Sequence, residues 1–201
     1  EEFILEAGDE HISSANVAVN MGKLLQLSGG AVYSNSGNVL QFDVSNRLKV
    51  VKEVIDEATA KVLIFAPFKH TIEMLYEFLN KTGISAECIT GSVSLNKRTK
   101  LFQDFQTLSE PRVLIIQPQA AAHGITLTAA NTVIWYSPIT SIETYLQANA
   151  RVNRKGQKNA MTVVNIEGSA VERKLYRLLS GRLEAHIKLL DLYEEIIEEN
   201  T

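Results

Sequence analysis

Short apolar runs alternate with longer amphipathic segments along most of this chain. The run at 62–66 is continuously apolar, which is typical of a parallel strand covered on both faces. The alternation predicts further strands at 86–89, 112–116, 132–136 and 161–166, and helices at 46–59, 70–82, 95–107 and 141–155. Strands that alternate with helices of this length form βαβ units. The pattern therefore predicts an α/β fold with a mostly parallel sheet.

Both ends of the chain lie outside this alternation. A helix is expected at 13–28, followed by a short hairpin whose turn is 34–38. A long helix over 170–198 is expected to close the chain, with Gly181 as a break. We therefore expect three regions, which are a lead-in at 1–44, an α/β lobe at 45–169 and a helical extension at 170–201.

Composition fits a soluble intracellular domain. The chain has 201 residues, 45% of them hydrophobic, and no apolar run approaches the ~20 residues that a membrane span requires. It starts with Glu1-Glu2 and without methionine, so we expect no signal peptide and an origin in a longer polypeptide. The single cysteine, Cys88, is expected to be a buried inert thiol. A cytoplasmic monomer that makes no membrane contact is the expectation.

The net charge of −3 excludes a surface that is basic all over. Basic residues still concentrate locally, at 97–100 and at 151–158, while 191–199 is strongly acidic. An acidic chain can track nucleic acid if its phosphate contacts are few and come from backbone amides at helix N-termini. A local nucleic-acid contact therefore remains compatible with the charge.

The segment from Gln147 to Gln157 reads Q-A-N-A-R-V-N-R-K-G-Q. It places Arg151 and Arg154 three residues apart on one face at the end of the expected helix, which Gly156 closes. Each guanidinium is a planar fork of donors that suits a phosphate. Two forks aimed at one point could stabilise the charge on a transferring γ-phosphoryl group. A solvated basic helix face is the alternative interpretation of the same spacing.

The sequence before this segment points to a family. An apolar strand at 113–116 leads through the loop 117–130 to a second apolar strand at 132–136. This order resembles motifs V and VI of the Swi/Snf-like ATPases, a branch of the superfamily-two helicases and translocases, in which motif VI reads Q-A-x-x-R-x-x-R-x-G-Q. The pair His123-Gly124 and the helix start at 141–145 are most similar to bacteriophage members. The resemblance also covers 23–33, 61–68 (motif IV) and 89–92.

The resemblance implies a RecA-like, P-loop NTPase-like lobe of three layers, namely the second lobe of an ATP-dependent DNA translocase. In it Arg151 and Arg154 would be the catalytic arginine fingers, and Gly124, Gln147 and Gln157 would contact nucleotide. No G-x-x-x-x-G-K-[ST] loop and no acidic magnesium box occur in this sequence. ATP with Mg²⁺ would therefore be held mainly by an N-terminal RecA-like lobe of the same polypeptide, and this chain alone would be inactive.

Duplex DNA is the partner that the resemblance implies. In open α/β sheets functional residues gather at the carboxyl ends of strands, where we expect Phe68, Gly91, Gly124 and the motif VI helix. The residues predicted to contact nucleic acid are Phe68, Lys69, Thr71, Gly91, Ser92 and His123. Plain capping and packing turns are the alternative interpretation at each position. The histidines show no metal-ligand spacing, so no metal site is predicted.

Several residues depart from the family pattern. Gln117 stands where the family often has a Ser or Thr that contacts DNA or couples it to ATP, and Gln119 replaces a basic residue. The His that is common before the second motif VI arginine is Asn153. These departures keep a second hypothesis open, in which the chain is a non-catalytic α/β interaction or scaffold module derived from a helicase lobe.

Overall fold

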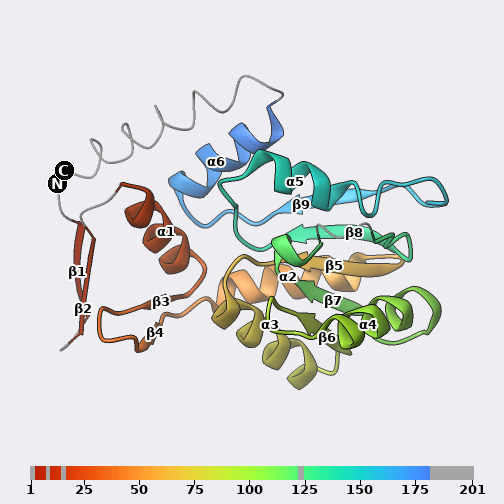
Figure 1. The fold of residues 1–201 in the computed structure, drawn as a ribbon, viewed down its shortest axis with the longest axis horizontal. Coiled ribbons are helices and arrows are strands. Elements are labelled where there is room, and N and C mark those ends of the chain that lie inside the picture. Colours follow the sequence, from red (N-terminus) through yellow and green to blue (C-terminus); the bar gives the residue numbers. More distant parts are fainter. Residues whose placement is uncertain (1–2, 8–9, 15–16, 122–124, 182–201) are drawn as a thin grey trace. The chain divides into compact units, whose positions relative to one another are not determined.

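The chain divides into two compact units in a computed structural model that describes residues 3–7, 10–14, 17–121 and 125–181 (Figure 1). One unit is Ser45–Ile166. The other combines Glu1–Val44 with Glu167–Thr201. The expected α/β alternation lies in the first of these units.

A five-stranded parallel sheet forms the centre of Ser45–Ile166, in the order β6-β7-β5-β8-β9. The inner strands are apolar and buried because helices cover both of their faces. The pairing confirms the predicted α/β fold with a parallel sheet. The strands are β5 (Lys61–Phe65), β6 (Ala86–Ile89), β7 (Val113–Ile116), β8 (Ala130–Trp135) and β9 (Thr162–Asn165).

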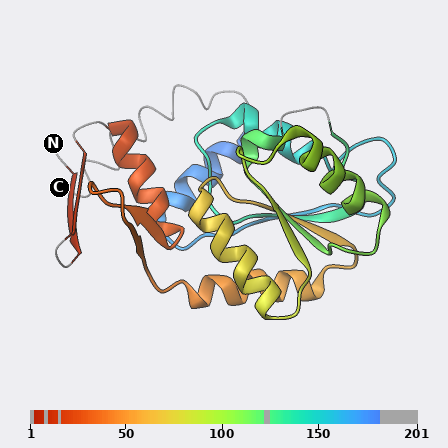
Figure 2. The same ribbon diagram turned by 60° about the horizontal axis from the view of Figure 1, so that its bottom comes forward.

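Helices lie on both faces of the sheet, as Figure 2 shows. On one face α2 (Ser45–Glu57) and α3 (Lys69–Lys81) pack their buried apolar side chains on β5 and β7. On the other face lie α4 (Leu95–Thr107), α5 (Ile142–Asn149) and the short 3₁₀ helix η1 (Pro118–Ala121). The result is a sheet between two helical layers, the three-layer arrangement that was predicted.

Aromatic packing fixes the α5 face of the sheet. The Trp135 ring lies 4.7 Å from the Phe65 ring and 4.7 Å from the Tyr145 ring, so β8, β5 and α5 meet at one point. Trp135 and Tyr136 are both fully buried. Burial of such rings contributes a large share of the apolar area that stabilises a core.

One buried charge joins α2 to the sheet. The Arg47 guanidinium donates through Nε to the Tyr136 carbonyl oxygen at 3.1 Å and through Nη2 to the Ile166 carbonyl oxygen at 3.0 Å. It also lies over the Tyr136 ring, 4.7 Å from its centre. Arg47 thereby satisfies carbonyl groups just beyond the ends of β8 and β9, which would otherwise be buried without a donor.

The edge strand β6 leaves Cys88 half-buried, so the prediction of a buried thiol was wrong in degree. A strand at the border of a sheet has a neighbour on one side only, which limits how far its side chains are covered. Burial, together with the carboxylate of Glu87, raises the pKa of the Cys88 thiol.

Over its described residues, the second unit contains two antiparallel hairpins and two helices. The hairpin of β3 (Ala31–Tyr33) and β4 (Val39–Gln41) confirms the one predicted around 34–38. The predicted helix at 13–28 begins later, because residues 13 and 14 pair with β1 in a ladder that no local pattern revealed. The remaining elements are β1 (Phe3–Ala7), β2 (Glu10–Ser14), α1 (Val17–Ser28) and α6 (Ala170–Ser180).

Helix α6 begins at a capping box in which Ser169 Oγ accepts from the Glu172 amide and a Glu172 carboxylate oxygen accepts from the Gly168 amide. It ends at its C-cap Gly181, the predicted break. The rest of the helix predicted over 170–198 lies outside the described residues.

Candidate functional site

The helical part of the motif VI segment is shorter than the sequence predicts. Helix α5 starts at the N-cap Ser141, whose Oγ accepts from the Thr144 amide at 3.2 Å, and it ends at Asn149. Arg151 and Arg154 follow it in a series of turns, so they do not share a helix face and that prediction was wrong. We call residues 150–157 the arginine turn.

Tertiary hydrogen bonds end α5 early. The Leu127 amide donates to the Arg151 carbonyl oxygen at 2.9 Å, which occupies an acceptor that a longer helix would use for its own backbone. One residue before the cap, the Asn149 side-chain oxygen accepts from Trp135 Nε1 at 3.0 Å. These bonds tie the end of the helix to β8 and to the segment that precedes β8. The chain therefore forms no further helical turn after Asn149.

The two arginines differ in burial, and their charges influence each other. Arg151 is buried, with 8% of its surface exposed. Arg154 is half-buried, and its Nη1 donates to Thr126 Oγ1 at 3.3 Å. Burial, and next to it the charge of Arg154, lower the pKa of Arg151. The arginine turn therefore concentrates positive charge beside Thr126.

Gln157 anchors the arginine turn. Its Nε2 donates to the Ala130 carbonyl oxygen at 2.7 Å, and its Oε1 accepts from the Asn159 amide at 3.1 Å. Gly156 has a φ of 106°, a left-handed conformation that favours glycine. The Gln157 amide is thus engaged inside the protein, at the place where a nucleotide contact was predicted.

The other predicted nucleotide contacts are separate from this anchor. Gln147 is exposed on α5, and its Nε2 donates to Glu143 Oε1 at 2.8 Å, one turn earlier. Gly124 and His123 lie outside the described residues, so both stay predictions. Arg151, Arg154 and Gln157 are the members of the predicted catalytic and nucleotide set that the structure brings together.

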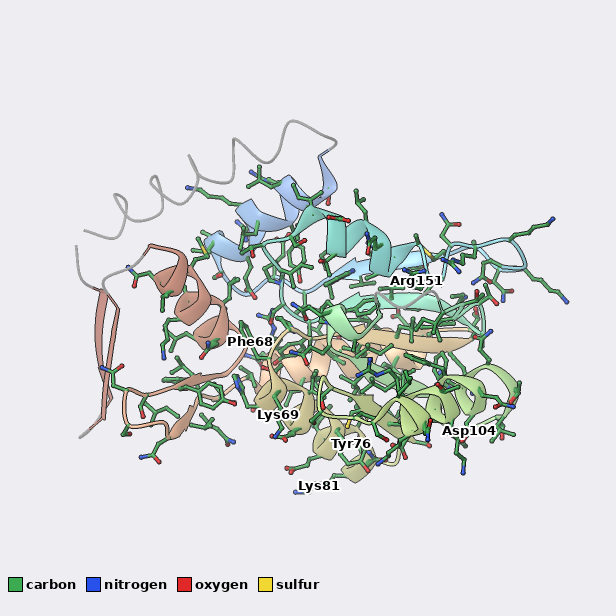
Figure 3. The ribbon with its side chains drawn as sticks, viewed as in Figure 1. Phe68, Lys69, Tyr76, Lys81, Asp104 and Arg151 are labelled. Carbon is green, nitrogen blue, oxygen red and sulfur yellow. The ribbon has the colours of Figure 1, made fainter. Side chains whose placement is uncertain are left out.

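The arginine turn lies at the amino-terminal edge of the sheet. Gln157 binds Ala130, the first residue of β8, and Arg151 binds Leu127 just before it. Phe68 follows the carboxyl end of β5, and Figure 3 shows Phe68 and Arg151 at opposite ends of the sheet. The expectation that motif VI gathers at the carboxyl ends of the strands was therefore wrong, because α5 runs back along β8.

At the carboxyl edge, the first turn of α3 presents uncapped backbone. Its N-cap Phe68 makes no side-chain capping bond, and the Phe68 ring stacks on the His70 ring at 5.8 Å. Lys69 is exposed, with its Nζ 3.6 Å from Glu73 Oε1. Thr71 is fully buried, so its side chain is not open to nucleic acid as was predicted. Helix amides and the Lys69 ammonium remain available to an anion here.

The neighbouring loop after β6 is occupied by internal bonds. The Gly91 amide donates to Gln117 Oε1 at 3.0 Å, and the Ser92 hydroxyl pairs with the Thr90 hydroxyl at 2.8 Å. Helix α4 is capped by Ser94, whose Oγ accepts from the Lys97 amide. The Gly91 amide that was expected to hold a phosphate is therefore bound to a side chain of the protein.

Two residues that organise these edges were not predicted to do so. Gln117 was noted only as a departure from the family, although a polar residue directly after an apolar strand indicates an edge contact. Arg47 lies four residues before Val51 and eight before Ile55, on the buried face of α2. A charge at an inward helical position is the signal that could have identified it.

Within the described ranges, no group of three or more His, Cys, Asp or Glu side chains could hold a metal ion. In the same described ranges, no helix is long and apolar enough to cross a membrane.

Comparison with solved structures defines the class of this fold. The crystal structure of the C-terminal part of the Fun30 ATPase domain superposes with a TM-score of 0.65 at 24% identity, covering 76% of this chain and 54% of that one. The C-terminal domain of the DEAD-box protein Dbp5 gives a TM-score of 0.58 at 21% identity, covering 78% of this chain and 92% of that one. The α/β unit is a RecA-like lobe of the helicase C-terminal type.

The family follows from residues 46–156, which match the helicase conserved C-terminal domain. The chain belongs to this family, as a C-terminal lobe of the Snf2 type within superfamily two. It is 27% identical over 149 residues to the ATP-dependent helicase fft2 of Schizosaccharomyces pombe, covering 72% of the chain and 12% of that protein. It is 31% identical over 126 residues to chromodomain-helicase-DNA-binding protein 1-like of Mus musculus, covering 62% of the chain and 14% of that protein.

The chain therefore spans only a small part of the relatives it matches. Its similarity to bacteriophage members stays a prediction from the motif residues.

Proposed function

We propose that this chain is the second motor lobe of an ATP-dependent, Swi/Snf-like DNA translocase and that it acts with a first RecA-like lobe of the same polypeptide. The observation that carries the proposal is the pair of arginines that the arginine turn places against the segment 126–130, through the bonds between Leu127 and Arg151 and between Arg154 and Thr126. Two guanidinium groups on one short turn suit an anion with several oxygen acceptors. A triphosphate is the anion that the family match makes relevant.

ATP with Mg²⁺, when bound between the lobes, supplies the phosphoryl group whose charge spreads during transfer. Arg154 is the more accessible finger, and the bond that its Nη1 donates to Thr126 Oγ1 fixes one edge of its fork. Arg151 lies deeper and adds a second positive charge from a fixed backbone position. We assign Mg²⁺ ligation to the first lobe, since none of the described carboxylates form a cluster suited to it.

Gln157 acts in this proposal as the support of the fingers. Its amide binds the start of β8 and thereby holds the arginine turn against the segment 126–130. Gln106 on α4 holds the same segment from the other side, since its Oε1 accepts from the Ala129 amide at 2.8 Å. A finger needs such support because small displacements of a charged group weaken transition-state stabilisation.

Duplex DNA is assigned to the carboxyl edge of the sheet. The uncapped first turn of α3 and the exposed Lys69 suit a backbone phosphate, which fits a motor that reads shape and charge without base sequence. The nucleotide edge and the DNA edge are then opposite ends of one rigid sheet. Movement along the duplex without strand separation is the form of motion we propose, in keeping with the Swi/Snf resemblance.

The test is ATP hydrolysis by the complete polypeptide, measured with and without duplex DNA, beside the 201-residue chain alone. We expect duplex DNA to stimulate the complete protein and the isolated chain to hydrolyse no ATP above background. Hydrolysis that is indifferent to DNA, or robust hydrolysis by the isolated chain after repurification, would contradict the proposal.

A further inference from the structure

The side chain of Gln117 joins three loops at the carboxyl edge of the sheet. Its Oε1 accepts from the Gly91 amide at 3.0 Å, and its Nε2 donates to the Pro67 carbonyl oxygen at 3.2 Å. Its backbone amide donates to the Ile89 carbonyl oxygen at 2.9 Å. Gln117 follows β7, Pro67 follows β5 and Gly91 follows β6, so one residue connects the loops after three strands.

Strand order explains why this position can reach both neighbours. β7 lies between β6 and β5, so a residue just beyond its carboxyl end has one loop on each side. The loop after β6 offers the Gly91 amide hydrogen, which needs an acceptor. The loop after β5 offers the Pro67 carbonyl oxygen, which needs a donor. A side-chain amide offers one of each at fixed spacing. A Ser or Thr hydroxyl is too short to reach both loops.

We propose that Gln117 is a positioning residue that fixes the spacing between the Pro67–Phe68 loop and the Gly91–Ser92 loop, so that both meet the nucleic-acid backbone as one surface. This role rests on the proposed function. The first turn of α3 is then the direct phosphate contact, and the Gly91 loop is held beside it. Loss of Gln117 would leave each loop intact but free to move relative to the other.

The energetic scale of this role is modest. Each neutral hydrogen bond of this kind makes a small net contribution to the free energy of unfolding. When both side-chain bonds of Gln117 are removed, the exposed Gly91 amide can donate to water in place of the lost acceptor. The fold should therefore tolerate the loss, while the geometry of the DNA surface should not. An effect on DNA affinity that exceeds the effect on stability separates positioning from simple packing.

The experiment uses the complete polypeptide with Gln117→Met, which keeps the length of the side chain and removes both bonds. The half-saturating duplex concentration for ATP hydrolysis, kcat at saturating duplex and Tm are measured together. We expect the half-saturating concentration to rise about tenfold, the size of one ordinary hydrogen bond, with kcat within about twofold of the wild type. Gln103→Met, an exposed change of the same chemistry on α4, is the matched control and should change none of the three.

A second variant, Gln117→Ser, separates spanning from direct contact with DNA. A serine cannot bridge the loops, so we expect it to behave like Gln117→Met. Wild-type behaviour of Gln117→Ser would overturn the proposal, as would a fall in kcat and Tm with an unchanged half-saturating concentration. A wild-type protein without DNA stimulation would instead refute the proposed function, and this role with it.

Discussion

A buried hydroxyl in α3 has no hydrogen-bond partner among the described residues. Thr71 is fully buried, and its Oγ1 makes no bond there. A buried polar group without a partner costs free energy, whereas an isosteric methyl group would not. At the scale of single residues, this makes Thr71 a position where the chain is less stable than it could be.

We predict that Thr71→Val raises the free energy of unfolding by about 1 kcal/mol, because it removes the desolvated hydroxyl and keeps the volume. Thermal or denaturant unfolding measures the change. Thr82→Val is the control, since Thr82 Oγ1 donates to the Leu79 carbonyl oxygen at 2.9 Å and its loss should destabilise slightly. A clear loss of stability in Thr71→Val would show that the hydroxyl is bound in solution.

Arg47 is the opposite case, a buried polar group that donates to two backbone carbonyl oxygens. We predict that Arg47→Leu lowers the free energy of unfolding by about 3 kcal/mol, because the carbonyl oxygens of Tyr136 and Ile166 lose charged donors. Denaturant unfolding of the variant measures the loss. Lys49→Leu, a change at an exposed position two residues on, should stay within about 0.5 kcal/mol. Equal stabilities of the two variants would refute the structural role of Arg47.

At the scale of elements, the sequence predicts best where local signals suffice. Strand β6 and helix α4 have the predicted bounds, because the signals for them, an apolar run and the Ser94 cap, depend only on residues close together in the sequence. Helix α5 was predicted to end six residues too late, since Gly156 marks the end of the arginine turn and not of the helix. The bond from the Leu127 amide to Arg151 that ends α5 joins distant segments, so no local pattern contains it.

The candidate site divides in the same way. Residue types and spacing identify Arg151 and Arg154, but they do not show that one is buried and the other half-buried. The backbone loop at Gly91 was expected to bind phosphate, and the amide is instead occupied by Gln117, which follows the strand after helix α4. Which donors remain available depends on tertiary partners, and these come from the fold.

Two glycines make the conformation of the arginine turn testable. A Cβ at Gly156 would meet no atom, yet its φ of 106° strains any L side chain. A Cβ at Gly22, inside α1, also meets nothing, and its backbone is helical. We predict that Gly156→Ala destabilises by about 1 kcal/mol and that Gly22→Ala stabilises by up to about 1 kcal/mol. Unfolding curves measure both, and a stabilised Gly156→Ala would contradict the turn geometry.

At the scale of the whole molecule, the proposed function places two tasks at opposite edges of the sheet of this lobe. The arginine turn lies at the amino-terminal edge of β8, and the uncapped turn of α3 lies at the carboxyl edge of β5. Because the parallel sheet between them is rigid, a displacement of one edge moves the other edge with it. The motor proposal requires this coupling, whereas a scaffold module requires only the fold.

Arg151 and Arg154 are expected to differ when they are replaced in the complete polypeptide. Arg151→Ala should lower both kcat and Tm, because its side chain is 8% exposed and part of the packed turn. Arg154→Ala should leave Tm nearly unchanged, because its side chain is half-buried and its Nη1 donates to the hydroxyl of the exposed residue Thr126. Arg154 therefore gives the cleaner test of the chemistry.

The most direct measurement is the DNA-stimulated kcat of the complete polypeptide carrying Arg154→Ala, with Arg154→Lys and the exposed Lys158→Ala measured beside it. An arginine finger is worth roughly 10³–10⁵ in rate, so we predict a loss on that scale with ATP and duplex affinities within a few-fold of the wild type. Lysine should restore little, because a point charge lacks the bidentate fork, and Lys158→Ala should turn over normally. Near-normal turnover by Arg154→Ala would contradict the finger assignment and favour a scaffold role for this lobe.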